Sequence, residues 1–155
     1  MTKQESYRIV IEAEIRAQML YEALAKSFTN NDTRSVFHEL IILEKGHEEK
    51  VRAAFKQEFP GEDFKLMGNL KLDLQDVNLN DPKDVLEYAI GKEDLANGIY
   101  LGMAEKESDA EIKAMMLKFA KEENDHKALL LAEVQRIQGA MQWYDPSELN
   151  GMMED

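Results

Sequence analysis

The stretch EIRAQMLYEALA, residues 14–25, has a counterpart 79 positions later in EDLANGIYLGMA, residues 93–104. Each stretch carries a glutamate and, seven residues on, a tyrosine. Residues seven apart differ by about 20° around an α-helix, so each glutamate and its tyrosine lie on one line of a helix. The two pairs are Glu14 with Tyr21 and Glu93 with Tyr100.

The same offset relates a second motif, a glutamate followed three residues later by a histidine. Glu44 and His47 recur as Glu123 and His126, and each of these glutamates lies thirty residues after a glutamate of the first motif. Residues three apart face the same side of a helix, about one turn from each other. Four glutamates and two histidines in this pattern are the kind of donor set that holds two metal ions inside a helical bundle.

Four long segments show the periodicity of amphipathic helices. We expect helices over residues 3–27, 30–58, 82–106 and 109–141. A short polar residue precedes each segment and is followed three residues later by a carboxylate, which is typical of a helix N-cap. The expected caps also pair at the 79-residue offset, Thr2 with Asp81 and Thr29 with Ser108.

The connections between these segments predict the fold. Two of them are very short, which favours two antiparallel helical hairpins. Residues 59–81 lack a helical period, so we expect them to form a long crossover between the hairpins. This pattern predicts an all-α, ferritin-like antiparallel four-helix bundle over residues 1–142. We expect residues 143–155 to form a short C-terminal tail, in which Trp143 and Tyr144 cap the core or contact a second subunit.

The composition restricts the partners. Nineteen basic and 31 acidic residues give the 155-residue chain a net charge of −12, which repels nucleic-acid backbones and anionic membranes but not cations. The absence of cysteine excludes disulfides, thiolate metal sites and thiol nucleophiles. The N-terminus lacks a signal-peptide pattern and no apolar run reaches about 18 residues, so we expect a cytoplasmic protein without nucleic-acid or membrane partners.

The repeated glutamates lie among apolar residues of their own helix faces, which indicates that they point inward. Four buried carboxylates at one level would repel one another, and two divalent cations would remove that cost. The alternative is a duplicated bundle that retains these groups only as a buried polar network. Glu12 has Arg8 and Arg16 four residues away on either side, so we expect it to be a solvated surface glutamate.

Taken together, these motifs resemble the rubrerythrin-like branch of the ferritin-like superfamily over nearly the whole chain. EIRAQMLYEALA and EKGHEEKV (residues 44–51) resemble the first hairpin of that family, and EDLANGIYLGMA and EENDHKALL (residues 122–130) resemble the second. The resemblance implies a homodimer, a role in oxidative stress and a centre of two iron ions per chain. In that centre two glutamates bridge the ions, two bind one ion each, and each ion takes one histidine. The implied bridges are Glu44 and Glu123, the implied terminal ligands are Glu14 and Glu93, and the implied histidines are His47 and His126.

Two departures from that family bear on the reaction. Rubrerythrins proper carry a rubredoxin-like domain with four cysteines, and this chain has no cysteine. We therefore expect electrons from an external donor such as a rubredoxin-type protein. Rubrerythrins proper also carry an additional glutamate one turn after the third-helix ligand, where this chain has Ala96. The site therefore resembles a more symmetric oxidase centre.

Three functions are compatible with the pattern. The resemblance implies a non-haem di-iron oxidoreductase that reduces hydrogen peroxide or dioxygen. One alternative is a ferroxidase or iron-handling protein, for which Fe(II) is the substrate. The other is a non-catalytic metal-binding helical bundle that acts through partners. Manganese or a mixed metal pair would fit the same donors as iron.

The remaining polar residues of the repeat have more than one interpretation. The hydroxyls of Tyr21 and Tyr100 could hydrogen-bond ligand carboxylates across the bundle and orient them for catalysis, or both residues could be core aromatics. Gln18 and Asn97 also match at the offset. Their amides could bind ligand or solvent, but we interpret them as residues that fill polar pockets and do not include them among the ligands. His38 has no counterpart and is expected to be structural or partly exposed.

Overall fold

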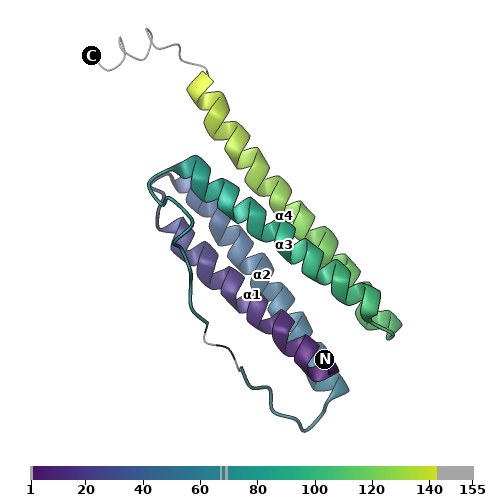
Figure 1. The fold of residues 1–155 in the computed structure, drawn as a ribbon. Helices are drawn as coiled ribbons and strands as arrows, with labels where there is room; N and C mark the ends of the chain where they lie inside the picture. The colour runs from purple at the N-terminus through teal and green to yellow at the C-terminus, as the bar shows by residue number, and fades with distance from the viewer. Residues whose placement is uncertain (1, 67, 69, 143–155) are drawn as a thin grey trace, which may run out of the picture.

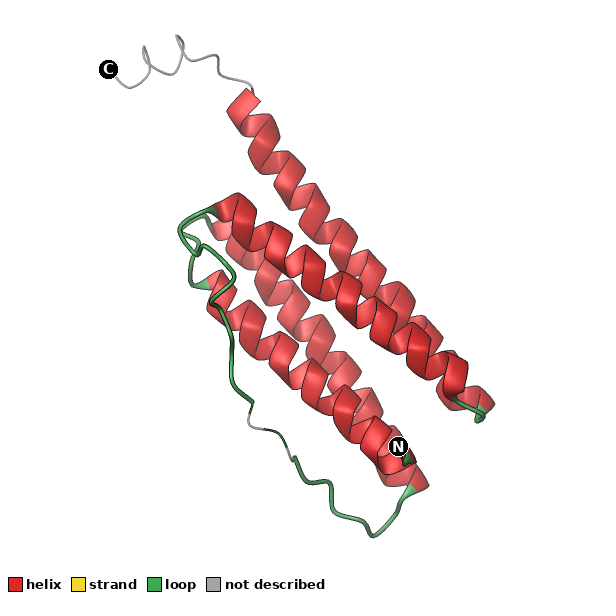
Figure 2. Ribbon diagram, in the orientation of Figure 1, coloured by secondary structure: helices red, strands yellow, loops and turns green. Residues whose placement is uncertain are grey.

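The computed structural model describes residues 2–66, 68 and 70–142. Over these residues the chain forms four α-helices joined by loops, without any β-strand (Figure 2). The helices are α1 (Lys3–Ala25), α2 (Asn31–Glu58), α3 (Pro82–Lys106) and α4 (Ala110–Gln142). None of these helices, within the described residues, is long and apolar enough to cross a membrane. The expected contacts of Trp143 and Tyr144 fall outside the described residues.

The helices pair into two hairpins, α1 with α2 and α3 with α4 (Figure 1). Contacts are dense within each hairpin and sparser between α2 and α4 and between α1 and α3. The described part of residues 59–81 contains turns and extended chain, and it links the hairpins as a long crossover. The predicted all-α bundle of two hairpins, with its ferritin-like topology, is therefore confirmed.

Two of the expected N-caps lie one residue too early. The cap of α2 is Asn30, not Thr29, and the first turn of α4 is held by Asp109, not Ser108. The side chains of Asn30 and Asp109 each accept hydrogen bonds from two backbone N–H groups of the following turn. Asparagine and aspartate are among the strongest N-caps, which explains why they displace their neighbours. The two observed caps are themselves 79 residues apart, so the repeat also holds for the corrected positions.

Helix α1 ends at Ala25, before the expected end at residue 27. The backbone N–H groups of Ser27 and Phe28 donate to carbonyls only three residues back, so the chain tightens and leaves the helix. This turn places the Phe28 ring against Phe37 of α2, with ring centroids 5.5 Å apart. Burial of Phe28 thus takes the place of the last half-turn of helix.

The hydrophobic core consists of two clusters with a polar layer between them. One cluster is built around Leu24, Phe37 and Leu86, and the other around Ile11 and Phe119. Along every helix, the repeated glutamate lies between residues of one cluster and residues of the other. Packing of the two clusters therefore sets the height of the polar layer near the middle of the bundle.

The crossover is held against α1 and α3. The Gly68 N–H donates to Glu12 Oε1 at 3.0 Å, and the Tyr88 hydroxyl donates to the Asp73 carbonyl at 3.1 Å. Glu12 is only 6% exposed, so the expectation of a solvated surface glutamate was wrong. Arg16 does lie beside it at 3.6 Å, as the helix spacing predicts, but the crossover covers this side of α1.

Candidate metal centre

The six predicted ligands meet in the polar layer, and all four helices contribute to them. Each of the six is at most 3% exposed. They form two groups of four, and within each group the candidate donor atoms all lie within 4.8 Å of one another. The groups are Glu14, Glu44, His47 and Glu123, and Glu44, Glu93, Glu123 and His126. Because Glu44 and Glu123 belong to both groups, the clusters could form a di-metal site that shares these two carboxylates.

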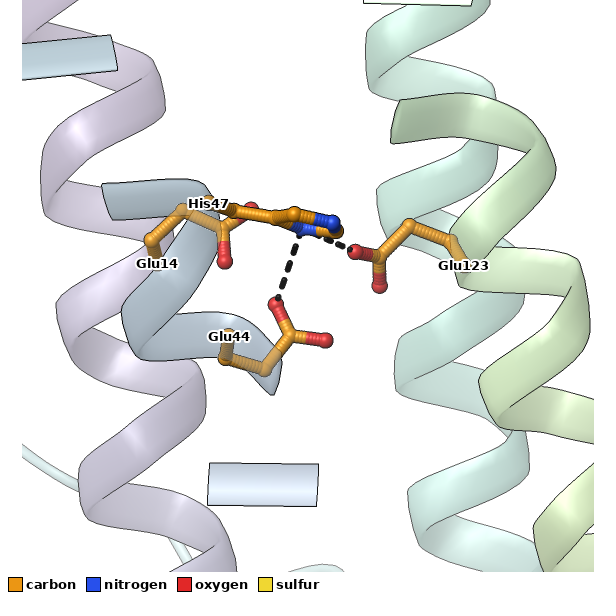
Figure 3. Close-up of side chains that lie close together, drawn as sticks. All are labelled: Glu14, Glu44, His47 and Glu123. Atoms are coloured by element: carbon orange, nitrogen blue, oxygen red, sulfur yellow. Dashed lines mark ion pairs between the residues drawn. The ribbon is translucent and has the colours of Figure 1, made fainter. Parts of the chain in front are cut away.

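Helix geometry brings the groups together. Figure 3 shows Glu14 of α1, Glu44 and His47 of α2 and Glu123 of α4 converging on one space. Glu44 and His47 are three residues apart, so one turn of α2 presents both side chains to the interior. The pair on α4 has the same spacing and supplies the second histidine.

Each histidine directs its Nδ1 atom at three carboxylates. The distances from His47 Nδ1 are 3.0 Å to Glu123 Oε1, 3.6 Å to Glu14 Oε1 and 3.8 Å to Glu44 Oε2. The distances from His126 Nδ1 are 2.7 Å to Glu44 Oε1, 3.6 Å to Glu93 Oε2 and 3.7 Å to Glu123 Oε2. The two histidines therefore occupy equivalent positions in the two halves of the site.

Four buried atoms of this layer lack a hydrogen-bond partner. They are Glu14 Oε2, His47 Nδ1, Glu93 Oε2 and Glu123 Oε1. Among the described residues, the one other buried side-chain atom without a hydrogen-bond partner is Arg34 Nε. Leaving such an atom unpaired costs about 1–3 kcal/mol, so four in one place indicate a site built for a ligand. Carboxylate oxygen and imidazole nitrogen are donors that suit iron and manganese, and the residues therefore fit a pair of divalent cations.

Without a bound metal, protons supply the positive charge of the site. Burial raises the pKa of Glu93 to about 8 and the pKa of Glu44 well above its usual value. Burial by itself lowers the pKa of each histidine, but the surrounding carboxylates outweigh it and raise the pKa of His47 to about 10 and that of His126 to about 12. Burial opposes ionisation of Glu123, yet the two histidines beside it, His126 and His47, lower its pKa. Metal ions would displace the protons from both histidines and from Glu44 and Glu93.

Both tyrosines of the repeat reach the site across the bundle. Tyr21 on α1 donates a hydrogen bond to Glu93 on α3, and Tyr100 on α3 donates one to Glu14 on α1. Burial, together with the nearby carboxylates, raises the pKa of both phenols, so their hydroxyls stay protonated and act as donors. Both rings are also part of the core, at 2% exposure. The structure therefore places each tyrosine in the core and on a predicted terminal ligand at once.

One residue that supports the site, Glu122, could not be predicted from the repeat. Glu122 Oε2 lies 2.5 Å from His47 Nε2, the ring nitrogen opposite to the one that meets the cluster. A carboxylate in this place fixes the orientation of the ring and its tautomer. The position 79 residues before Glu122 is Leu43, so the residue that corresponds to Glu122 in the other half of the repeat is a leucine, which cannot support His126 in the same way. The one signal in the sequence was a second glutamate beside Glu123, and charged helices contain many such pairs.

The side chains of Gln18 and Asn97 form hydrogen bonds that do not involve the carboxylates of the predicted ligands. Gln18 Nε2 donates to the Glu14 carbonyl at 3.2 Å and to Glu48 Oε1 at 2.8 Å, and Asn97 Nδ2 donates to the Ala120 carbonyl at 2.7 Å. These bonds satisfy both amides away from the ligand carboxylates. His38 is exposed on α2.

Comparison with known proteins identifies relatives of the chain. A family model described as Rubrerythrin matches residues 8–76 and 84–151. A solved structure of a hypothetical protein from Pyrococcus furiosus is 24% identical, with a TM-score of 0.71 and 94% of each chain covered. A solved structure of an uncharacterised conserved protein from Magnetospirillum magnetotacticum MS-1 is also 24% identical, with a TM-score of 0.72 over 88% of this chain and 95% of its own. These two likenesses concern the fold. No curated protein matches the chain.

Proposed function

The chain belongs to the rubrerythrin family, and on this premise we propose that it is a non-haem di-iron oxidoreductase that reduces hydrogen peroxide or dioxygen with electrons from an external donor. The observation that best supports the proposal is that two buried groups of donors share Glu44 and Glu123. In this proposal Glu44 and Glu123 would hold both metal ions. Glu14 and His47 would hold one of them, and Glu93 and His126 would hold the other.

Two reduced iron or manganese ions held by these residues would supply the two electrons that reduction of hydrogen peroxide to water consumes. The chain's own contribution is to position the ligands. Tyr21 and Tyr100 hold the two terminal carboxylates by hydrogen bonds, and Glu122 holds the His47 ring. Ala96 occupies the position at which rubrerythrins proper carry an additional glutamate, so the two ends of the proposed site would carry equal ligand sets. The 155 residues contain no cysteine for an iron–sulfur cluster, which is why the proposal includes a separate electron donor.

An anaerobic titration with Fe(II), followed by rapid mixing with peroxide or dioxygen, tests this function. We expect two irons per chain and formation of a diferric absorbance that is faster with peroxide. Glu44→Ala and Glu123→Ala should abolish binding of the pair, because each removes a ligand from both groups. Glu49→Ala, at an exposed position of α2, is the matched control and should bind two irons as the unaltered chain does.

No binding, or one weak ion that is indifferent to Glu44→Ala and Glu123→Ala, would exclude the di-metal function. The chain would then act as a helical bundle without this catalytic centre.

A second candidate is iron handling, with Fe(II) as the substrate. A hollow of about 470 Å³ between α2 and α4 has the acidic residues Glu122 and Asp125 in its lining, together with Lys50, and reaches His47 and His126. Such a hollow favours entry of a cation to the centre. Oxidation of many Fe(II) equivalents per chain in the same experiment would support this candidate over peroxide reduction.

A further inference from the structure

A cavity of about 350 Å³ lies between α1 and α3. It reaches the candidate metal centre from a different side than the hollow between α2 and α4. Its lining includes Glu14, Glu44 and Tyr100, all of them buried. Sites for small organic molecules span about 300–1,000 Å³, so the cavity has the size of such a site. Peroxide and dioxygen would occupy a small part of it.

The sequence explains why space remains between these two helices. Helices α1 and α3 contact each other sparsely, and the facing positions Ala13, Ala17 and Ala96 carry only a methyl group. Larger apolar residues, among them Val10 and Leu20, complete the wall. The passage from the surface to the buried carboxylates is therefore lined mainly by apolar side chains.

The rim of the cavity has the opposite chemistry. Arg16, Lys71 and Lys92 line it and are exposed, and Asp73 is the exposed carboxylate among the lining residues. Together with Glu12, which lies 3.6 Å from Arg16, the rim has three cations and two carboxylates, an excess of positive charge that contrasts with the net charge of −12 of the whole chain. Positive charge is thus gathered where an apolar passage opens to solvent, which favours an anionic group at the mouth.

The crossover forms one wall of the cavity. Lys71, Leu72 and Asp73 all line it. The bond from Gly68 to Glu12 holds the segment just before them to α1, and the bond from Tyr88 to Asp73 holds the segment itself to α3. The cavity is therefore formed in the resting structure, and no opening of the helices is required to create it.

We propose that this cavity binds a small amphiphilic carboxylate, with its alkyl tail in the apolar passage and its head group at Arg16, Lys71 and Lys92. The apolar lining of the passage disfavours a charged group, so the head group stays at the rim and the tail points inward. The proposal rests on the proposed function only in placing the end of the tail beside a metal centre. Binding itself requires the cavity and the rim, not the metals.

Calorimetric titration of the full chain with decanoate, octanoate and 1-octanol tests the proposal, both metal-free and with Fe(II) bound under anaerobic conditions. We expect one decanoate per chain. Each buried methylene strengthens binding about fourfold, so decanoate should bind about 15-fold more tightly than octanoate. Octanoate should bind more tightly than 1-octanol, and salt should weaken the binding of octanoate alone.

Two matched pairs of variants locate the site. Ala96→Leu fills the passage and should weaken decanoate binding by at least about tenfold, whereas Ala114→Leu makes the same change at an exposed position of α4 and should have no effect. Lys92→Glu reverses one charge of the rim and should weaken binding of decanoate several-fold. Lys121→Glu makes that reversal at an exposed position of α4 and is the control.

Nuclear Overhauser contacts from the terminal methyl of decanoate should reach Val10 and Ala13. Contacts instead to Ile42 and Leu43, which line the hollow beside α4, would overturn the proposal, as would equal affinities for the two acids or indifference to Ala96→Leu. A dimer that buries the exposed Leu95 and excludes decanoate would overturn it too. A chain that binds decanoate but not two irons refutes only the proposed function, and a chain that binds two irons but not decanoate refutes only this inference.

Discussion

The hydroxyl of Tyr100, on α3, donates a hydrogen bond to the carboxylate of Glu14, on α1, through the centre of the bundle. The reciprocal bond runs from Tyr21 of α1 to Glu93 of α3. Each hairpin therefore orients a carboxylate of the other hairpin. As a result, the geometry of the candidate metal centre depends on docking of the two hairpins and not only on the helices that carry the ligands.

Tyr100→Phe should weaken metal binding by about 10–100-fold, the usual effect of removing the hydrogen-bond partner of a metal ligand. The reason is that Glu14 Oε1 loses its donor while Oε2 already lacks a partner. Anaerobic Fe(II) titration measures the change. Tyr88→Phe, which loses only the bond to the Asp73 carbonyl, is the control. Unaltered affinity and oxidation rate in Tyr100→Phe and Tyr21→Phe would leave both rings with a packing role only.

Glu122→Gln should weaken one of the two metal positions and spare the other. The carboxylate supports His47, whereas the repeat places Leu43 at the equivalent position for His126. We expect a titration in two phases, with one ion bound as before and the second about tenfold more weakly. Glu49→Gln should leave both phases unchanged. An equal loss of affinity for both ions would contradict the conclusion that Glu122 supports only the position of His47.

Metal binding should release protons, and its affinity should rise with pH. The raised pKa values of Glu44, Glu93, His47 and His126 mean that all four groups carry protons at neutral pH in the metal-free site. Coordination requires these protons to leave, up to four per metal pair by this count. Calorimetry in buffers with different ionisation enthalpies measures the release directly. Binding enthalpies that do not depend on the buffer would contradict this protonation state.

The metal-free chain should lose stability as the pH rises from about 5 to 9. Unfolded, Glu93 ionises near a pKa of 4.5, but burial in the fold raises its pKa to about 8. Its contribution to stability is therefore complete below the unfolded value and is lost as the pH rises through the folded value. His47, raised from 6.5 to about 10, adds a loss of the same sign at higher pH. Thermal unfolding measures the effect, at about 2–4 °C per kcal/mol for a chain of this length.

Two controls separate this loss from a general effect of pH. Glu93→Gln cannot ionise, so it should flatten the decline below about pH 8. Bound metal should also suppress the decline, because cations stabilise the ionised carboxylates. A melting temperature of the metal-free chain that stays level or increases over this range would show that Glu93 is already ionised there.

Glu12→Ala should destabilise the fold by about 1–3 kcal/mol, because the part-buried hydrogen bond from the Gly68 N–H to a charged acceptor is lost. Urea unfolding measures the free energy, and hydrogen exchange at the Gly68 amide should accelerate. Glu22→Ala, at an exposed position of the same helix, should change neither quantity. Gly68→Ala gives an independent check. Its added Cβ would lie 3.2 Å from Glu12 Oε2 and Arg16 Nη2, which requires those side chains to shift.

The repeat made the inward face of each helix predictable. Glu14 and Glu93 lie seven residues before their tyrosines, and helix geometry converts such spacing into direction and height. The exact caps were harder to predict, because Thr29 stands beside Asn30 and Ser108 beside Asp109. All four residues can cap a helix, and the offset cannot choose between neighbours that are both repeated.

Contacts between different helices, or between a helix and the crossover, were harder to predict from the sequence. The pairing of Glu12 with Arg16 follows from their spacing on one helix. The burial of Glu12 does not, because the crossover that covers Glu12 approaches from outside the helix. Glu122 supports His47 for the same kind of reason, since α4 has to lie beside α2 for the two side chains to meet. Periodicity describes one helix at a time and contains no information about such neighbours.

The amino-acid sequence by itself determined the four helices, their two hairpins and the level of the six buried donors, because local backbone geometry and the burial pattern dictate all three. Only the tertiary structure decided that Tyr100 orients Glu14, that His47 rests on Glu122, and that a cavity opens between α1 and α3. These features depend on the distances between helices. Close packing of the two core clusters sets those distances, and they follow from the volumes of many side chains together rather than from the spacing of a few.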